Sequence, residues 1–210
     1  AEGRFYVSGG SRECAIAVYE INEKEKLVRV KKTSLKKRYA EKALLASGGL
    51  NSIIFDGYNS LVALSNSNKY AFSTDMGVTW NFSIFPGNIP GSAVTFGNGV
   101  WWAVSKEKDL YSSNDIGVGW QLFSEELIDI EINNIAFLNE QLFIVGNNGK
   151  IFSSFDGLTW EESLIADENL GLDILSIASA QIEFEYEIEE DASSDTFFDT
   201  SSDIIESIIE

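Results

Sequence analysis

Short apolar runs alternate with turn residues along most of the chain. Clusters of Gly, Asn, Ser and Asp separate these runs and are typical of turns. No window of twelve residues shows a convincing helical period. Apolar runs this short predict β-strands, so the expected fold class is all-β. The clearest runs span residues 52–55, 60–64, 93–96, 100–104, 134–137 and 141–145.

A motif ending in Trp recurs every forty residues. Its copies are KYAFSTDMGVTW (69–80), DLYSSNDIGVGW (109–120) and KIFSSFDGLTW (150–160), the last one residue shorter. With the apolar runs before it, each unit predicts four strands joined by tight turns. We call the Ser-to-Trp part of each copy a Ser-x-Asp hairpin. The residues that define the three hairpins are Ser73, Asp75, Gly77 and Trp80; Ser113, Asp115, Gly117 and Trp120; and Ser154, Asp156, Gly157 and Trp160.

The chemistry of the motif favours a structural role for all of these residues. The Asp is expected to accept the backbone N–H two residues further on, and the Gly to adopt a positive φ. The Ser hydroxyl is expected to satisfy a backbone group beside the turn. The Trp is expected to pack across the hairpin with its N–H near solvent. These roles predict a hairpin staple rather than a catalytic carboxylate.

The segments STDMGVTW, SNDIGVGW and SFDGLTW resemble the Asp-box, or bacterial neuraminidase repeat, Ser-x-Asp-x-Gly-x-Thr-Trp. Gly119 departs from the Thr of that pattern. The repeat occurs in sialidases, sortilin-type receptors, a photosystem assembly factor and many phage and giant-virus proteins. The resemblance implies a β-propeller of four-stranded antiparallel blades. It says little about function, because the motif lies on the outside of the blade in these families.

The forty-residue period divides the whole chain into units. Residues 1–49 are expected to form an atypical N-terminal blade, 50–165 three Asp-box blades, and 166–210 an acidic degenerate C-terminal blade or tail. This division predicts a single propeller domain over 1–210, with about five blades in a range of four to six. Residues 34–47 have a second interpretation as a short helix, because apolar positions there share a helical face.

Charge is distributed unevenly along the chain. The net charge is −18; residues 1–42 hold 11 of the 15 Lys and Arg, whereas residues 161–210 hold 16 acids and no Lys or Arg. One hypothesis pairs Arg29 and Lys31, on one strand face, with a Glu ladder in a neighbouring terminal strand. The alternative is a solvated edge that blocks aggregation. The ladder consists of Glu183, Glu185, Glu187 and Glu189.

Composition excludes several classes of function. The chain has no His, which removes His-dependent catalytic pairs and His-bearing zinc sites, and the lone Cys14 cannot form an intrachain disulfide. The acidic surface opposes nucleic-acid binding. The sequence contains no run of about 18 apolar residues, so we expect no membrane insertion, and no signal peptide is visible. We expect no cofactor and no metal.

Sialidase activity conflicts with the arrangement of the arginines. The resemblance implies that a sialidase needs three Arg from different blades, but all four lie before residue 39. A two-carboxylate glycosidase is harder to dismiss, although nothing singles out Asp56, Glu140 or Asp173. The acids of 191–203 do not follow an EF-hand pattern. The four arginines are Arg4, Arg12, Arg29 and Arg38.

Exposed aromatic side chains are the best candidates for binding. Trp101, Trp102 and Tyr58 could stack on a sugar or anchor a protein partner, although both indoles also suit packing between blades. The chain is therefore expected to be a non-enzymatic interaction module. Resemblance and size favour a structural or adhesion component of a virus or phage particle, hence a virion or extracellular location. The alternatives are a glycan-binding propeller and, next, a glycoside hydrolase fragment.

Overall fold

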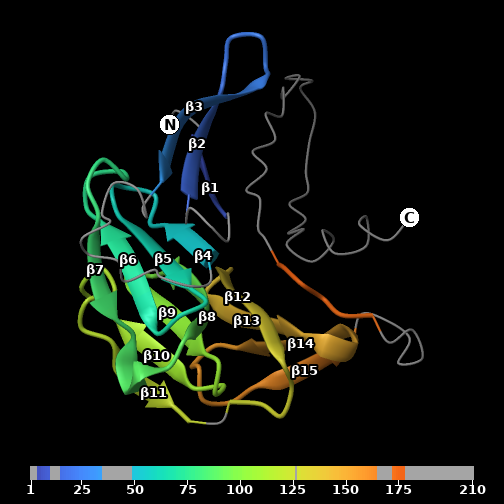
Figure 1. Cartoon of the computed structure of the whole chain (residues 1–210). Coiled ribbons are helices and arrows are strands. Elements are labelled where there is room, and N and C mark those ends of the chain that lie inside the picture. Colours follow the sequence, from blue (N-terminus) through green and yellow to red (C-terminus); the bar gives the residue numbers. More distant parts are fainter. Residues whose placement is uncertain (1–3, 10–14, 35–48, 126, 165–171, 178–210) are drawn as a thin grey trace, which may run out of the picture. The chain divides into compact units, whose positions relative to one another are not determined.

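The computed structural model describes residues 4–9, 15–34, 49–125, 127–164 and 172–177 (Figure 1). All of these belong to one compact unit, Ala1–Ser179; the second unit, Ala180–Glu210, lies outside the described residues. The described chain consists of antiparallel strands and two short 3-10 turns, η2 (Pro86–Asn88) and η3 (Asn147–Gly149). The all-β prediction is therefore confirmed.

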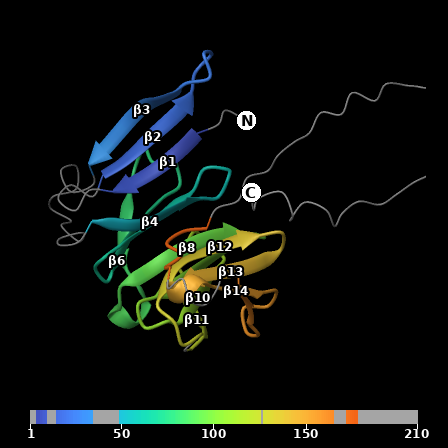
Figure 2. The same cartoon turned by 90° about the vertical axis from the view of Figure 1, so that its right-hand side faces the viewer.

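The first three strands form an antiparallel sheet of their own, which we call the N-terminal sheet (Figure 2). Its order is β1 (Arg4–Gly9), β2 (Ala15–Ile21) and β3 (Leu27–Ser34). These strands lie within residues 1–49, which were expected to form an atypical first blade. The remaining part of that prediction, a fourth strand or a helix up to residue 47, lies outside the described residues.

The next twelve strands form three four-stranded antiparallel meanders, which we call blades 1 to 3. Each meander contains one forty-residue unit, as the repeat predicted. Consecutive strands pair throughout, because tight turns join antiparallel neighbours. Blade 1 is β4 (Leu50–Phe55), β5 (Leu61–Ser65), β6 (Lys69–Ser73) and β7 (Asn81–Ile84); blade 2 is β8 (Gly91–Gly97), β9 (Val100–Ser105), β10 (Leu110–Ser113) and β11 (Gln121–Ser124); blade 3 is β12 (Ile132–Leu138), β13 (Gln141–Gly146), β14 (Lys150–Ser154) and β15 (Glu161–Leu164).

The hydrophobic core lies between successive sheets. One cluster joins Ile16 of the N-terminal sheet to Leu61 and Trp80 of blade 1. A second cluster joins blades 1 and 2, and a third joins blades 2 and 3. The middle strands β5, β9 and β13 pack on both faces, which explains why their sequences are nearly continuous apolar runs. Four-stranded meanders that pack face to face in succession are the blades of a β-propeller.

The first strands of the blades carry a repeated hydrogen bond to the next repeat. Asn51 Nδ2 donates to Gly91 O, Ser92 Oγ to Ile132 O, and Asn133 Nδ2 to Ile174 O. Each acceptor lies 40 or 41 residues after its donor. Ile174, in the described segment 172–177, thus accepts the bond that Gly91 and Ile132 accept in the earlier repeats. Four sheets are described, within the predicted range of four to six, and the rest of the expected C-terminal blade lies outside the described residues.

The expectation that Arg29 and Lys31 share a strand face is wrong. Val18 pairs with Lys31 but the next residue, Tyr19, pairs with Arg29, so a β-bulge separates the two basic residues. Cross-strand partners share a face, and Val18 and Tyr19 point to opposite faces. Lys31 Nζ donates to Gly77 O of blade 1 at 3.4 Å. The Glu ladder that was expected to oppose them lies outside the described residues.

Candidate functional site

The first Ser-x-Asp hairpin connects β6 to β7 through a network of hydrogen bonds. The buried Ser73 hydroxyl donates to Asp75 Oδ1 at 2.8 Å and accepts the Gly77 N–H at 2.9 Å. Asp75 also accepts both the backbone N–H and the hydroxyl of Thr79, at 2.7 and 2.6 Å. Gly77 has a φ of 78°, and the Trp80 indole donates to its carbonyl at 3.1 Å. Every predicted motif residue therefore takes part in holding the turn.

The second hairpin, between β10 and β11, has the same plan with fewer bonds. Ser113 Oγ and the Gly119 N–H both donate to Asp115 Oδ1 at 2.6 Å, but Gly119 has no hydroxyl to add. The indole Nε1 of Trp120 is buried without a hydrogen-bond partner in the described structure. Gly119 in place of the Thr found in the first hairpin thus removes one bond to the carboxylate.

The third hairpin, between β14 and β15, is one residue shorter and closes differently. Asp156 accepts the N–H groups of Leu158 and Thr159, both at 2.8 Å. The Ser154 hydroxyl accepts the Gly157 N–H, and the Trp160 indole donates to Gly157 O at 3.2 Å. The residue before the glycine has a positive φ in the longer copies, Met76 and Ile116, whereas here Asp156 itself precedes the glycine.

Two details of the predicted motif chemistry need correction. Only in the short third hairpin does the Asp carboxylate accept the N–H of the residue two positions after it. In the first two hairpins, which are one residue longer, the carboxylate accepts the N–H of the residue four positions after it. The indole N–H of Trp80 and Trp160 donates to a glycine carbonyl instead of facing solvent.

Hydrogen bonds stabilise the ionised form of all three carboxylates. Burial raises the pKa of Asp75, but bonds from Thr79 and Ser73 outweigh it and lower this pKa to about 2. The Ser113 hydroxyl and the Gly119 N–H lower the pKa of Asp115. The N–H groups of Thr159 and Leu158 lower the pKa of Asp156. A general acid needs a raised pKa, so this electrostatic environment suits turn capping and not proton donation.

The tryptophans of the hairpins join neighbouring sheets. Trp80 clusters with Ile16 of the N-terminal sheet, Trp120 clusters with Tyr70 of blade 1 and with Phe85, which follows it, and Trp160 packs against the cluster that joins blades 2 and 3. The Trp120 ring lies 6.4 Å from Tyr70 and 5.7 Å from Phe85, centroid to centroid. Each hairpin therefore fastens its own blade to the preceding sheet, which the sequence did not indicate.

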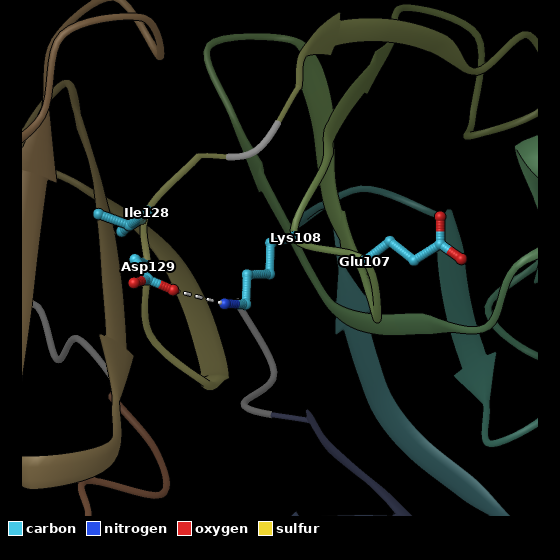
Figure 3. Close-up of a pocket in the computed structure, with 4 residues that line it drawn as sticks. All are labelled: Glu107, Lys108, Ile128 and Asp129. Atoms are coloured by element: carbon cyan, nitrogen blue, oxygen red, sulfur yellow. Dashed lines mark hydrogen bonds and ion pairs between the residues drawn. The ribbon is translucent and has the colours of Figure 1, made fainter.

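One surface pocket of about 410 Å³ lies where the β9–β10 turn meets the segment before β12 (Figure 3). Lys108 Nζ pairs with Asp129 Oδ1 at 3.3 Å, and the Glu107 side chain points away from this pair. The Leu127 N–H donates to Lys108 O and ties the two segments together. Ile128 supplies an apolar wall. An exposed ion pair of this kind suits a polar contact.

The predicted aromatic candidates lie in three different environments. Tyr58 is 81% exposed in the β4–β5 loop, and this loop contacts the first hairpin through a bond from Met76 N to Asn59 O. Trp101 is buried at 3% exposure and its ring lies 4.7 Å from Phe96. Trp102 is half-buried, with its ring edge-on to Phe123 at 4.9 Å. The two indoles pack between sheets, and Tyr58 lies at the surface.

The carboxylates considered for glycoside hydrolysis lie in separate segments between or after the strands. Asp56 Oδ1 accepts the N–H groups of Tyr58, Asn59 and Ser60. Asp173 Oδ1 accepts the Asn148 N–H, and Glu140 lies in the β12–β13 turn. Among the residues that the structure describes, no group of three or more Cys, Asp or Glu could hold a metal ion. That part of the chain also contains no helix long and apolar enough to cross a membrane.

Comparison with known proteins finds similar structures only. No family model and no curated protein matches the sequence. A solved structure described as YCF48 bound to D1 peptide aligns over 55% of this chain and 40% of its own, with a TM-score of 0.49 and 16% identity. YCF48 from Cyanidioschyzon merolae aligns over 54% and 36%, with a TM-score of 0.47 and 22% identity. The chain thus spans well under half the length of these proteins.

Sequence reasoning missed one surface feature of the third hairpin. Phe155 and Leu158 are 79% and 62% exposed at its tip. The position of Phe155 holds Thr74 and Asn114 in the other two copies. A position-by-position comparison of the hairpins would have identified Phe155 as an exception, because a buried role cannot be assigned to a position that is polar elsewhere.

Proposed function

We propose that this chain is a non-enzymatic β-propeller module that binds a protein partner. The observation that carries the proposal is the exposure of Tyr58, Phe155 and Leu158 on turns whose hydrogen bonds hold them rigidly. Rigid, exposed bulky side chains are the usual anchors of protein interfaces. The described pocket is polar and the motif carboxylates are used as turn caps, so neither feature supports catalysis.

A finer proposal is that the module is a structural or adhesion component of a virus or phage particle. The support is the resemblance of the three hairpins to the Asp-box repeat, which is frequent in such proteins. The residues that cap the turn recur in all three hairpins, whereas the side chains exposed at the tips differ between copies. This arrangement suits loops that make contacts from a constant scaffold.

A glycan-binding propeller is the second candidate, and Tyr58 favours it. An exposed aromatic ring can stack on the apolar face of a sugar. Asp56 fixes the loop by accepting three backbone N–H groups, so the ring is presented on a turn that is already ordered. A hydrolase is the third candidate and would require a carboxylate outside these caps.

Three measurements on the purified chain separate these functions. We expect binding to members of a random peptide array, no binding to a glycan array, and no turnover of a panel of chromogenic glycosides. Binding to glycans alone that is lost in Tyr58→Ala would replace the protein-binding proposal with a lectin. Glycoside turnover that persists through repurification would establish a hydrolase. A silent peptide array would refute protein-segment binding.

A further inference from the structure

The third hairpin and the adjacent β11 share an exposed apolar surface, which we call the outer patch. It consists of Phe123, Phe155 and Leu158, whose side chains are all exposed. An added Cβ at Gly157 would lie 3.0 Å from Phe123 Cε1, so the Phe123 ring rests against the turn that holds Phe155 and Leu158. Phe155 and Leu158 belong to none of the core clusters of the described chain.

The centre of the outer patch is held in place by packing. The Phe123 ring is edge-on to Trp102 at 4.9 Å, and Trp102 packs into the core between blades 2 and 3. Asp156 and Ser154 fix the turn through bonds to Leu158, Thr159 and Gly157. A surface that is ordered before binding loses little entropy when a partner arrives.

The position of β11 favours an extended partner. This strand is the edge of blade 2 and pairs only with β10 in the described structure. An edge strand offers unpaired N–H and C=O groups to a segment laid along it. Leu122 and Phe123 are uncharged, whereas the corresponding edge strand of blade 3 begins with Glu161 and Glu162. Charged residues protect β15 against strand addition, and β11 lacks them.

The charges around the outer patch are acidic. The carboxyl of Asp156 stays ionised because hydrogen bonds lower its pKa. Glu125 follows β11, and Glu161 and Glu162 are both exposed on the edge strand β15. Lys150 is paired with Glu162 at 2.9 Å and so does not offset the remaining carboxylates. A partner segment that carries Lys or Arg would meet complementary charge here.

We propose that the outer patch binds an extended protein segment in which bulky apolar residues alternate with Lys or Arg. This rests on the proposed protein-binding function and adds the surface and the chemistry of the partner. The apolar residues of the segment cover Phe155 and Leu158, and its cations face Asp156, Glu161 and Glu125. A second copy of this chain is disfavoured as occupant, because each copy carries a net charge of −18.

The test uses a fluorescein-labelled peptide with Phe and Leu two residues apart and Lys on either side of each. Its partner probe has Glu in place of every Lys. In low salt, fluorescence anisotropy should show the Lys peptide binding at least tenfold more tightly than the Glu peptide. The double variant Phe155→Ser/Leu158→Ser should weaken this binding at least tenfold. Its matched control is Val118→Ser, at the equivalent exposed tip of the second hairpin, which should change binding less than twofold.

A second variant keeps the test informative if the double variant is unstable. Leu158→Lys adds a cation to an exposed position and should weaken the Lys peptide while strengthening the Glu peptide. Equal binding of the two peptides, or an equal loss in Val118→Ser, would refute the outer patch while leaving protein binding in place. A concentration-dependent dimer that dissociates in the double variant would assign the patch to self-association instead.

Discussion

The first and third Ser-x-Asp hairpins share the same motif residues but differ in what they contact. The first packs against the neighbouring sheet, and the third exposes apolar side chains at its tip. In the first, Thr79 completes the bonds to Asp75, and Trp80 is buried against the N-terminal sheet. In the third, Asp156 caps a shorter turn with two N–H bonds, Trp160 is half-exposed, and Phe155 and Leu158 face solvent. The motif therefore fixes the turn by hydrogen bonds. The residues between the motif positions decide whether the turn packs against the preceding sheet or exposes apolar side chains to solvent.

The largest expected effect is the difference between the two tryptophans. Trp80→Ala should lower the free energy of unfolding by about 3–5 kcal/mol, because a buried indole leaves a cavity between two sheets. Trp160→Ala should cost less, about 1–3 kcal/mol, since part of that ring is already in water. Urea denaturation followed by fluorescence measures both, and equal losses would contradict the comparison.

The buried serines should show a smaller effect that is similar in both hairpins. Ser73→Ala leaves the buried Gly77 N–H without its acceptor and should cost about 1–3 kcal/mol. Ser154→Ala removes the corresponding bond to Gly157 and should cost a similar amount. Ser112→Ala on β10 is the control and should be close to neutral. A neutral Ser73→Ala would show that the turn finds another acceptor.

The second hairpin allows the missing hydroxyl to be restored. Gly119→Thr should raise stability by about 1 kcal/mol by supplying the bond that Thr79 gives Asp75. The new Cβ would meet Asp115 Oδ2 at 2.8 Å, so the carboxylate has to rotate slightly. NMR titration should show the pKa of Asp115 falling further toward the value of Asp75. Thr79→Gly should raise the pKa of Asp75, because it removes the hydroxyl bond to that carboxylate. An unchanged pKa in both variants would contradict the idea that this hydroxyl bond lowers the pKa.

Acid should reveal the smallest effect. The folded-state pKa of Asp75, about 2, lies below its ordinary value of 3.8. Its contribution to stability is therefore fully present above pH 3.8 and is lost as the pH falls toward 2. Between these values the melting temperature of the wild type should fall more steeply than that of Asp75→Asn. Parallel curves would mean that the carboxylate has the same pKa in the unfolded chain.

The repeat predicted the blades because its spacing and turn residues are local properties of the sequence. Trp80, Trp120 and Trp160 mark equivalent positions, and Gly77, Gly117 and Gly157 all have positive φ as expected. Contacts between blades were not predictable, since a pattern along one strand does not show which sheet its residues face. For the same reason the burial of Trp101 could not be distinguished from exposure, whereas the exposure of Phe155 could have been inferred by comparing the three hairpins position by position. No sequence signal indicates the β-bulge between Arg29 and Lys31, and for that reason the expectation that they share a strand face was wrong.

The forward hydrogen bonds of the first strands have a consequence for synthesis on the ribosome. Asn51 meets its acceptor only when Gly91 has been made, Ser92 waits for Ile132, and Asn133 waits for Ile174. The newest blade of a nascent chain therefore lacks this bond until the first residues of the next repeat have been made. A pause in translation before one of these three acceptors is made would extend the time for which its side-chain donor lacks that hydrogen bond.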